Sequence, residues 1–186
     1  MALKIGINGF GRIGRMVLRS IIENNRKDIE VVVINNRGNS EISSFLLQHD
    51  TIHGKLKAKI SHSDKKIEIS GKKINLISET EISKINWKQY KADVVLECTG
   101  KFNTKEKSAQ HIKSGAKKVL VSAPCKGAIN IVFGVNQETL KKSDQVISAA
   151  SCTTNCLAPV AKVINDNFGI ETGFMTTIHS YTTDQR

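Results

Sequence analysis

The chain has 186 residues, of which 28 are Lys or Arg and 17 are Asp or Glu, so its formal net charge is +11 at pH 7. Hydrophobic residues make up 39% of it, which is too many for a disordered chain. No apolar run reaches the roughly 18 residues that span a bilayer, and the first residues form neither a secretory leader nor an Arg-rich transit peptide. We therefore expect a globular cytoplasmic protein without membrane contacts.

The expected elements alternate between strands and helices along the chain. In chain order they are a strand at 3–8, a helix at 12–24, a strand at 30–35, a helix at 40–48, hairpin strands within 55–77, a strand at 92–97, a helix at 105–114, strands at 118–122, 129–133 and 146–149, a helix at 152–167 and a long apolar strand at 169–180. Pro159 should kink the last helix or delay its start. The alternation predicts an α/β fold with a doubly wound, mostly parallel sheet.

The four cysteines, Cys98, Cys125, Cys152 and Cys156, include no Cys-x-x-Cys pair and no other metal-ligand spacing. We expect them to be reduced, and we predict no metal site. Most basic residues are Lys scattered through polar stretches, so the sequence predicts no dedicated nucleic-acid surface.

The first strand and the first helix are joined by a glycine motif of the form GxGxxG. A strand before the motif and a helix after it are the context in which it binds a dinucleotide. Gly9 allows a tight turn, Gly11 lets the backbone approach a pyrophosphate, and Gly14 lets helix and strand pack closely. The free N–H groups at Arg12 and Ile13 would bind the phosphates. We therefore predict a Rossmann-type cofactor domain, and the alternative is a glycine-rich turn without a ligand.

The end of the second predicted strand bears on the choice of cofactor. In NAD-binding folds a carboxylate about 20 residues after the motif binds the adenosine ribose, but here Asn36 and Arg37 occupy that region. A carboxylate would repel the 2′-phosphate of NADP, whereas Asn36 can bond a hydroxyl and Arg37 a phosphate. We therefore predict NAD or NADP, with NADP accepted. The alternative for Arg37 is a side chain that points into water.

Small polar residues follow two later strands. Ligands of open α/β sheets bind at the carboxyl ends of the strands, so Thr99, Gly100 and Ser122 are predicted to line the cofactor cleft. Ordinary turn chemistry is the alternative explanation for these residues.

A candidate nucleophile lies at the predicted start of the last helix. Cys152 would feel the positive end of the helix dipole, which lowers the pKa of a thiol and favours the thiolate. Ser151 and Thr153 add hydroxyl groups beside it, and Cys156, one turn later, is interpreted as a structural residue that faces into the packing. His179, on the predicted apolar strand, is either the base that such a thiol needs or a buried core histidine.

Three runs of sequence resemble the phosphorylating glyceraldehyde-3-phosphate dehydrogenases. They are INGFGRIGR at 7–15, SCTTNCLAP at 151–159 and TTIHSY at 176–181, and the resemblance extends over the whole chain. It implies that Cys152 attacks the aldehyde, that His179 acts as the base, and that a hydride passes to the nicotinamide. Inorganic phosphate then releases the thioester as an acyl phosphate, 1,3-bisphosphoglycerate, in glycolysis, gluconeogenesis or carbon fixation.

The resemblance also assigns roles to individual residues. The backbone N–H of Cys152, with His179, would stabilise the developing oxyanion. Positions that hold substrate or inorganic phosphate are Ser151, Cys152, Thr153 and Thr182, with Asp184 in the same stretch. Positions that contact the dinucleotide are Arg12, Ile13, Asn36, Thr80 and Ser122. NAD-specific members carry Asp in place of Asn36 and often Arg or Lys in place of Thr80, so a strict NAD preference is in doubt.

Two domains are implied, a dinucleotide-binding domain at 1–150 and the start of an α+β catalytic domain at 151–186. Family chains are much longer, so we expect this piece alone to have little or no dehydrogenase activity. The full-length protein is expected to be a homotetramer. Two other interpretations remain open. Erythrose-4-phosphate dehydrogenase uses the same Cys and His chemistry, and a non-catalytic, basic dinucleotide-fold module could bind RNA or a partner protein.

Overall fold

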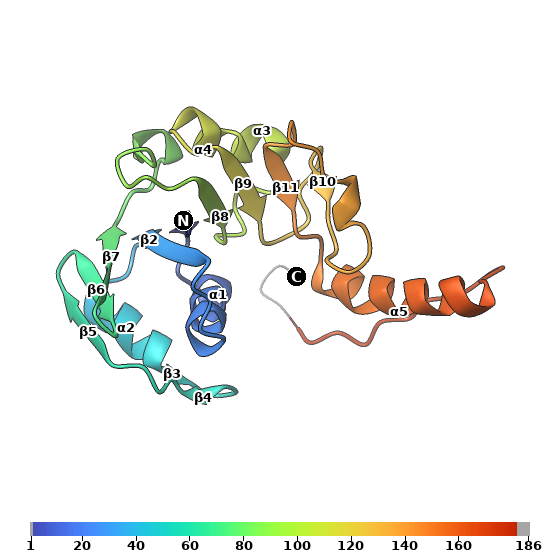
Figure 1. The fold of residues 1–186 in the computed structure, drawn as a ribbon, viewed down its shortest axis with the longest axis horizontal. Coiled ribbons are helices and arrows are strands. Elements are labelled where there is room, and N and C mark those ends of the chain that lie inside the picture. The colour runs from blue at the N-terminus through green and yellow to red at the C-terminus, as the bar shows by residue number, and fades with distance from the viewer. Residues whose placement is uncertain (1, 182–186) are drawn as a thin grey trace.

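The computed structural model describes residues 2–181 of the chain, and within them one large sheet forms a curved band (Figure 1). Its strand order is β10-β11-β9-β8-β1-β2-β7-β6-β5. The strands of its central and distal parts are β1 (Leu3–Asn8), β2 (Ile29–Asn35), β8 (Val94–Glu97), β9 (Lys118–Val121), β10 (Ile129–Asn130) and β11 (Val146–Ser148). β1 pairs in parallel with both β2 and β8, so the chain crosses between the two halves of the sheet beside β1. This order confirms the predicted doubly wound α/β fold.

The predicted hairpin region forms the other edge of the sheet. β5 (Ile60–Ser63), β6 (Lys66–Ile69) and β7 (Lys72–Ile77) are antiparallel neighbours, and β7 joins β2 in parallel. Ser70 and Gly71 connect β6 to β7 with φ values of 48° and 86°. Two positive φ values are what a two-residue turn needs in order to match the twist of its strands.

Helices cover both faces of the sheet. One apolar cluster joins α1 (Arg12–Glu23) and α2 (Ser40–Gln48) to β1, β2, β6 and β7, and it includes partly buried Val94 and Leu96 of β8. Val95, between those two residues, belongs to a different cluster with Trp87. Because successive side chains of a strand point to opposite faces, the two clusters lie on opposite sides of the sheet.

The predicted helix at 105–114 is present as two short pieces, α3 (Lys105–Ser108) and α4 (Gln110–Lys113). Ala109 between them keeps right-handed helical angles, φ −63° and ψ −13°, so the two pieces form one helix with an irregular turn. The predicted strand at 129–133 is shortened to β10. The N–H of Val132 donates to Asn136 Oδ1 at 2.8 Å, so it does not donate to a neighbouring strand.

Short elements complete the described chain. β3 (His49–Asp50) and β4 (Gly54–Lys55) form a separate two-stranded sheet, and single 3₁₀ turns lie at Ile82–Lys84 and Gln137–Thr139. In residues 2–181, no helix combines the length and the apolar character that a membrane crossing requires.

The C-terminal part departs most from expectation. α5 (Cys152–Phe168) contains Pro159 and begins at Cys152, so the predicted late start is wrong. Residues 169–181 form no strand, because a strand needs a neighbour for its backbone hydrogen bonds, and this exposed segment instead runs back beside α5 (Figure 1). Cys156 is exposed, and its predicted place in the packing is wrong, because the described part of α5 buries no residue.

Candidate active site

The glycine motif forms the turn from β1 into α1. Gly9 has φ +93°, a conformation that favours glycine. A Cβ atom on Gly14 would lie 2.2 Å from the carbonyl oxygen of Gly9, so only glycine allows this packing. A Cβ atom on Gly11 would meet nothing within 4 Å, and Arg12 and Ile13 at the start of α1 are exposed. The open backbone and the unpaired N–H groups of the first helical turn fit a pyrophosphate.

A cavity of about 310 Å³, which we call the dinucleotide cavity, lies beside this turn at the carboxyl ends of β1, β2 and β8. The predicted cofactor residues in its lining are Gly9, Gly11, Asn36, Arg37, Thr80 and Thr99. Gly100 follows Thr99 with φ +72°. Ser122 lies at the end of β9, where its N–H donates to the carbonyl oxygen of Glu97 at 3.0 Å. Gly100 is therefore next to the lining, and so is Ser122, because its side chain forms a hydrogen bond with Cys98 of the lining.

Sequence reasoning missed part of the lining, namely Asn8, Asn35, Glu79, Ile82, Lys101 and Phe102. Asn8 and Asn35 are the last residues of β1 and β2. Polar residues that end adjacent parallel strands meet at one edge of the sheet, so the pattern contained a usable signal for these two. Glu79 lies in the loop after β7, and no motif marks it.

Two predicted residues are held by neighbours. Asn36 Nδ2 donates to Ser43 Oγ on α2 at 3.0 Å, which fixes a neutral amide near the position where NAD-specific folds place a carboxylate. Arg12 Nη1 lies 2.8 Å from Asp50 Oδ2. The backbone N–H of His53, and then the Arg12 guanidinium, lower the pKa of Asp50 to about 2. The Arg12 guanidinium at the start of α1 therefore forms an ion pair with the ionised carboxylate of Asp50.

The second site, which we call the thiol site, is formed by the start of α5 and the segment after it. Ser151 caps the helix by accepting a hydrogen bond from the N–H of Thr154 at 3.0 Å. Cys152 is the first helical residue, and its Sγ atom lies 3.1 Å from Nε2 of His179. His179 Nδ1 lies 2.7 Å from the carbonyl oxygen of Ser180. Because a carbonyl oxygen only accepts, Nδ1 carries the ring proton, and Nε2 faces the thiol as a free base.

This contact moves the pKa values of both partners in the direction that favours a thiolate. Hydrogen bonds with His179 and then Thr153 lower the pKa of Cys152. The hydrogen bond with Cys152 raises the pKa of His179. Burial has the opposite effect on two other thiols, because it raises the pKa of Cys98 to about 11 and also raises the pKa of Cys125.

A cavity of about 420 Å³ adjoins the pair, between α5 and residues 175–179. The structure therefore brings together two residues that lie 27 positions apart in the sequence. Both Cys152 and His179 are exposed, so the interpretation of His179 as a buried core histidine is wrong.

Comparisons with known proteins match both parts of the chain to one family. The family model described as the NAD binding domain of glyceraldehyde 3-phosphate dehydrogenase matches residues 3–105, and the model of its C-terminal domain matches 151–186. The chain belongs to the glyceraldehyde-3-phosphate dehydrogenase family. The first of these models supports NAD binding by the N-terminal part of the chain.

Relatives with the name glyceraldehyde-3-phosphate dehydrogenase match the full chain. The proteins of Cereibacter sphaeroides and Xanthobacter flavus are 53% and 50% identical over 186 residues, which cover 100% of this chain and 55% and 56% of theirs. The protein of Geobacillus stearothermophilus is 48% identical over 188 residues, which cover 100% of this chain and 56% of that protein. The chain thus spans about half the length of the curated relatives it matches.

Some of the positions at which the family holds substrate or phosphate lie among the described residues, and others do not. The Ser151 hydroxyl caps α5 and lies 2.7 Å from Thr154 Oγ1, and Thr153 forms a hydrogen bond with Cys152. Thr182 and Asp184 lie outside the described residues. Among residues 2–181, no group of three or more His, Cys, Asp or Glu side chains is arranged to hold a metal ion.

Proposed function

We propose that the chain is the cofactor-binding part and the nucleophilic start of a phosphorylating glyceraldehyde-3-phosphate dehydrogenase. The observation that carries this proposal is the 3.1 Å contact between Cys152 Sγ and His179 Nε2. The dinucleotide cavity in the same chain and the names of the relatives support it. The C-terminal family model begins at residue 151, which supports a domain boundary between 1–150 and 151–186.

The first step uses the Cys152–His179 pair. His179 Nε2 takes the thiol proton, and the Cys152 thiolate attacks the aldehyde carbon of glyceraldehyde 3-phosphate. The new C–S bond leaves negative charge on the former carbonyl oxygen, which takes the proton back from His179 and forms a thiohemiacetal. The N–H of Cys152 has no partner within α5, because it belongs to the first helical turn, and it is available to stabilise the charge.

The second step oxidises this adduct. Bound NAD or NADP supplies the acceptor for the hydride that leaves the carbon atom. His179 takes the hydroxyl proton as the C=O bond forms, so Cys152 then carries a thioester. Inorganic phosphate attacks the thioester, the C–S bond breaks, and Cys152 leaves as a thiolate beside the protonated His179. The products of this chemistry are an acyl phosphate, the reduced cofactor and a proton.

We also propose that NADP is accepted beside NAD. Asn36 and the cationic Arg37 line the dinucleotide cavity, and Glu79 is an acidic residue in the same lining. We expect Asn36→Asp to weaken NADPH binding by about tenfold through like-charge repulsion, with NADH affinity changed about twofold at most. Titration of the chain with each reduced cofactor, followed by nicotinamide fluorescence, measures both affinities.

The exposed residue Asn86 offers a matched control, because Asn86→Asp adds the same charge outside the cavity lining. Equal losses of NADPH affinity in the two variants would assign the effect to overall charge. Failure of the unaltered chain to bind NADPH would contradict the proposal of a second cofactor.

For the full-length protein we propose a cytoplasmic homotetramer that acts in glycolysis, gluconeogenesis or carbon fixation, and family resemblance supports this. The names of the relatives do not favour erythrose-4-phosphate dehydrogenase. A non-catalytic RNA-binding module gives no reason for a thiol to lie against an imidazole. Turnover of the two sugar phosphates by the full-length protein tests the assignment, and faster oxidation of erythrose 4-phosphate would contradict it.

A further inference from the structure

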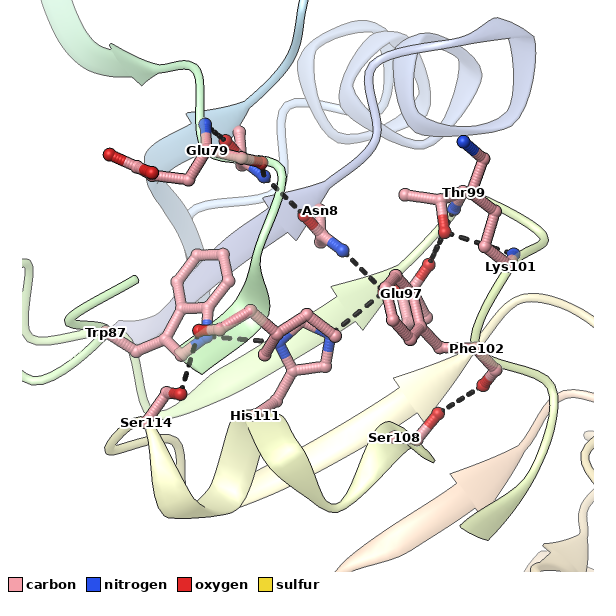
Figure 2. A network of polar contacts seen from close by, with 12 residues as sticks. Asn8, Glu79, Trp87, Glu97, Thr99, Lys101, Phe102, Ser108, His111 and Ser114 are labelled. Carbon is pink, nitrogen blue, oxygen red and sulfur yellow. Dashed lines mark hydrogen bonds and ion pairs between the residues drawn. The ribbon is translucent and has the colours of Figure 1, made fainter. Parts of the chain in front are cut away.

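A buried polar network, drawn in Figure 2, includes Asn8 and Thr99 of the lining of the dinucleotide cavity. Glu97, the last residue of β8, is 1% exposed, and His111 on α4 and Trp87 are 0% exposed. Figure 2 shows His111 between the other two side chains. Trp87 Nε1 lies 3.1 Å from His111 Nδ1, and His111 Nε2 lies 2.9 Å from Glu97 Oε2. The mechanism proposed above uses none of these three residues.

The indole N–H of Trp87 determines which ring nitrogen of His111 carries the proton. An indole N–H only donates, so His111 Nδ1 must accept and cannot carry a proton. The ring proton is then on Nε2, which donates to Glu97. His111 is therefore a neutral imidazole that holds a carboxylate, and the pair is not a bridge between two full charges.

The remaining donors to Glu97 are residues of the cavity. Asn8 Nδ2 donates to Glu97 Oε2 at 2.6 Å, the backbone N–H of Thr99 donates to Oε1 at 2.7 Å, and the Thr99 hydroxyl also donates to Oε1. Burial would raise the pKa of Glu97, but the hydrogen bonds from His111, Thr99 and Asn8 outweigh burial and lower it. Glu97 is thus an ionised residue that accepts at both oxygens.

The network continues from Asn8 to Asn35 and to Glu79 in the loop after β7. Asn8 Oδ1 accepts from Asn35 Nδ2 at 2.7 Å. Asn35 Nδ2 also donates to the carbonyl oxygen of Glu79 at 2.9 Å, and Asn35 Oδ1 accepts from the N–H of Glu79 at 2.8 Å. The ends of β1, β2 and β8 and the loop after β7 are therefore joined by one set of hydrogen bonds, and all four of these segments contribute to the cavity lining.

We propose that Glu97 is a positioning residue for the adenosine half of the cofactor, held in place by the Trp87–His111 pair. The assignment rests on the proposed cofactor site. Asn8 and Thr99 line the cavity, and their orientation depends on an acceptor at each oxygen of Glu97. A glutamine at this position presents one oxygen and one NH₂ group, so either orientation sets a donor against a donor. Glu97→Gln therefore disturbs the hydrogen bonds that orient Asn8 and Thr99 while the size of the side chain at position 97 hardly changes.

Binding of ADP-ribose to the chain, measured by calorimetry, tests the role of Glu97. We expect Glu97→Gln to weaken binding by about tenfold or more, because a buried donor loses its partner. We expect inorganic pyrophosphate to bind at the glycine loop, so its weaker binding, followed by NMR, should change about twofold at most. Equal losses for both probes would indicate general destabilisation and overturn the assignment. Glu30→Gln, which removes the same charge at an exposed position, is the matched control.

Variants of His111 test the supporting pair in a second way. A glutamine can accept from Trp87 with its oxygen and donate to Glu97 with its nitrogen, whereas a leucine can do neither. We expect His111→Gln to keep most of the affinity for ADP-ribose and His111→Leu to lose it by about tenfold. His62→Leu, at an exposed position on β5, is the matched control. Equal affinities of His111→Leu and His111→Gln would overturn the role of the pair.

The unaltered chain provides a test that does not depend on the folding of a variant. Trp87 is the one tryptophan in the sequence, so the chain has a single indole N–H resonance in an ¹⁵N-labelled sample. We expect this resonance to shift when ADP-ribose saturates the chain, although Trp87 is buried outside the cavity lining. Binding of ADP-ribose without any shift of this resonance would overturn the assignment of Glu97 but not the proposed cofactor site. Absence of ADP-ribose binding would overturn the proposed cofactor site as well.

Discussion

The dinucleotide cavity and the thiol site are held in different ways. At the cavity, buried Asn8 of β1 hydrogen-bonds with Glu97 of β8 and with Asn35 of β2, and the close packing at Gly9 and Gly14 leaves no room for a Cβ atom. At the thiol site, Cys152 and His179 are exposed and the described part of α5 buries no residue. The geometry of the cavity is therefore set by many contacts, whereas that of the thiol site depends on a helix start and one side-chain contact.

The difference follows from the distance in sequence over which each site is assembled. The cavity uses the sheet, whose strand order brings distant residues to one edge. The thiol site uses a local feature, the first turn of α5, together with one residue from the extended segment that follows. We expect substitutions at the cavity to act on stability and affinity together, and substitutions at the thiol site to act on chemistry alone.

The largest expected effect is the loss of chemistry without loss of the fold. In the full-length protein, Cys152→Ser should lower phosphorylating dehydrogenase turnover by at least about a thousandfold, because a hydroxyl beside His179 is a far weaker nucleophile than a thiolate. The thermal midpoint of the 186-residue chain should be unchanged by the same substitution, since Cys152 is exposed in it. Cys125→Ala, which removes a buried thiol away from the site, is the control. Substantial turnover by Cys152→Ser would contradict the assigned nucleophile.

A pair of glycine variants at the turn from β1 into α1 should separate the effect of packing from that of ligand approach. Gly14→Ala places a Cβ atom 2.2 Å from the Gly9 carbonyl oxygen and should lower the free energy of unfolding by about 1–3 kcal/mol. Gly11→Ala meets no protein atom within 4 Å, but Gly11 is the N-cap of α1, where alanine is less favourable than glycine, so stability should fall by about 0.5 kcal/mol. Urea unfolding measures both changes.

For ligand affinity we expect the variant with the small effect on stability, Gly11→Ala, to show a clear loss. Gly11→Ala should weaken ADP-ribose binding by about tenfold, because the added methyl group lies where the pyrophosphate approaches the backbone. Unchanged affinity in Gly11→Ala, measured by calorimetry, would place the pyrophosphate elsewhere.

The smallest expected effect concerns the contact between the exposed Arg12 side chain and the largely covered Asp50 side chain. The pKa of Asp50 is lowered from 3.8 to about 2, first by the N–H of His53 and then by Arg12. The ionised form of Asp50 therefore contributes its full stabilisation of the fold above pH 3.8, and this contribution is lost as the pH falls through about 2. We expect Asp50→Asn to lower the thermal midpoint slightly near neutral pH and to reduce its fall over that acid range. An equal effect of Asp64→Asn, in an exposed turn, would show that the contact is not responsible.

Much of the fold could be predicted because it depends on local patterns. Apolar runs and the glycine motif locate β1, α1 and β2, since turns and helix starts are set by residues close in sequence. The wrong prediction of a strand at 169–180 has a physical cause. An apolar pattern indicates that a segment can be buried in a sheet. The strand forms only if a neighbouring strand supplies partners for its backbone hydrogen bonds.

The candidate site shows the same limit. Periodicity placed Cys156 one turn after Cys152, but it could not show whether another element covers that face of α5. The contacts of His111 with Glu97 and with Trp87 depend on packing between β8, α4 and a loop, so spacing does not reveal them. A charged residue at the end of an apolar strand was the one available signal.

The most direct test concerns the ionisation of Cys152 beside His179. Iodoacetamide labelling of the chain, mapped by peptide mass over a range of pH, reports the reactivity of each cysteine. Cys152 should react first, and His179→Asn should move the midpoint of its profile to higher pH, because the hydrogen bond that lowers the pKa of Cys152 is removed. His62→Asn should leave the profile unchanged. Equal labelling of Cys152 and the exposed Cys156, or a profile that does not move in His179→Asn, would contradict the account.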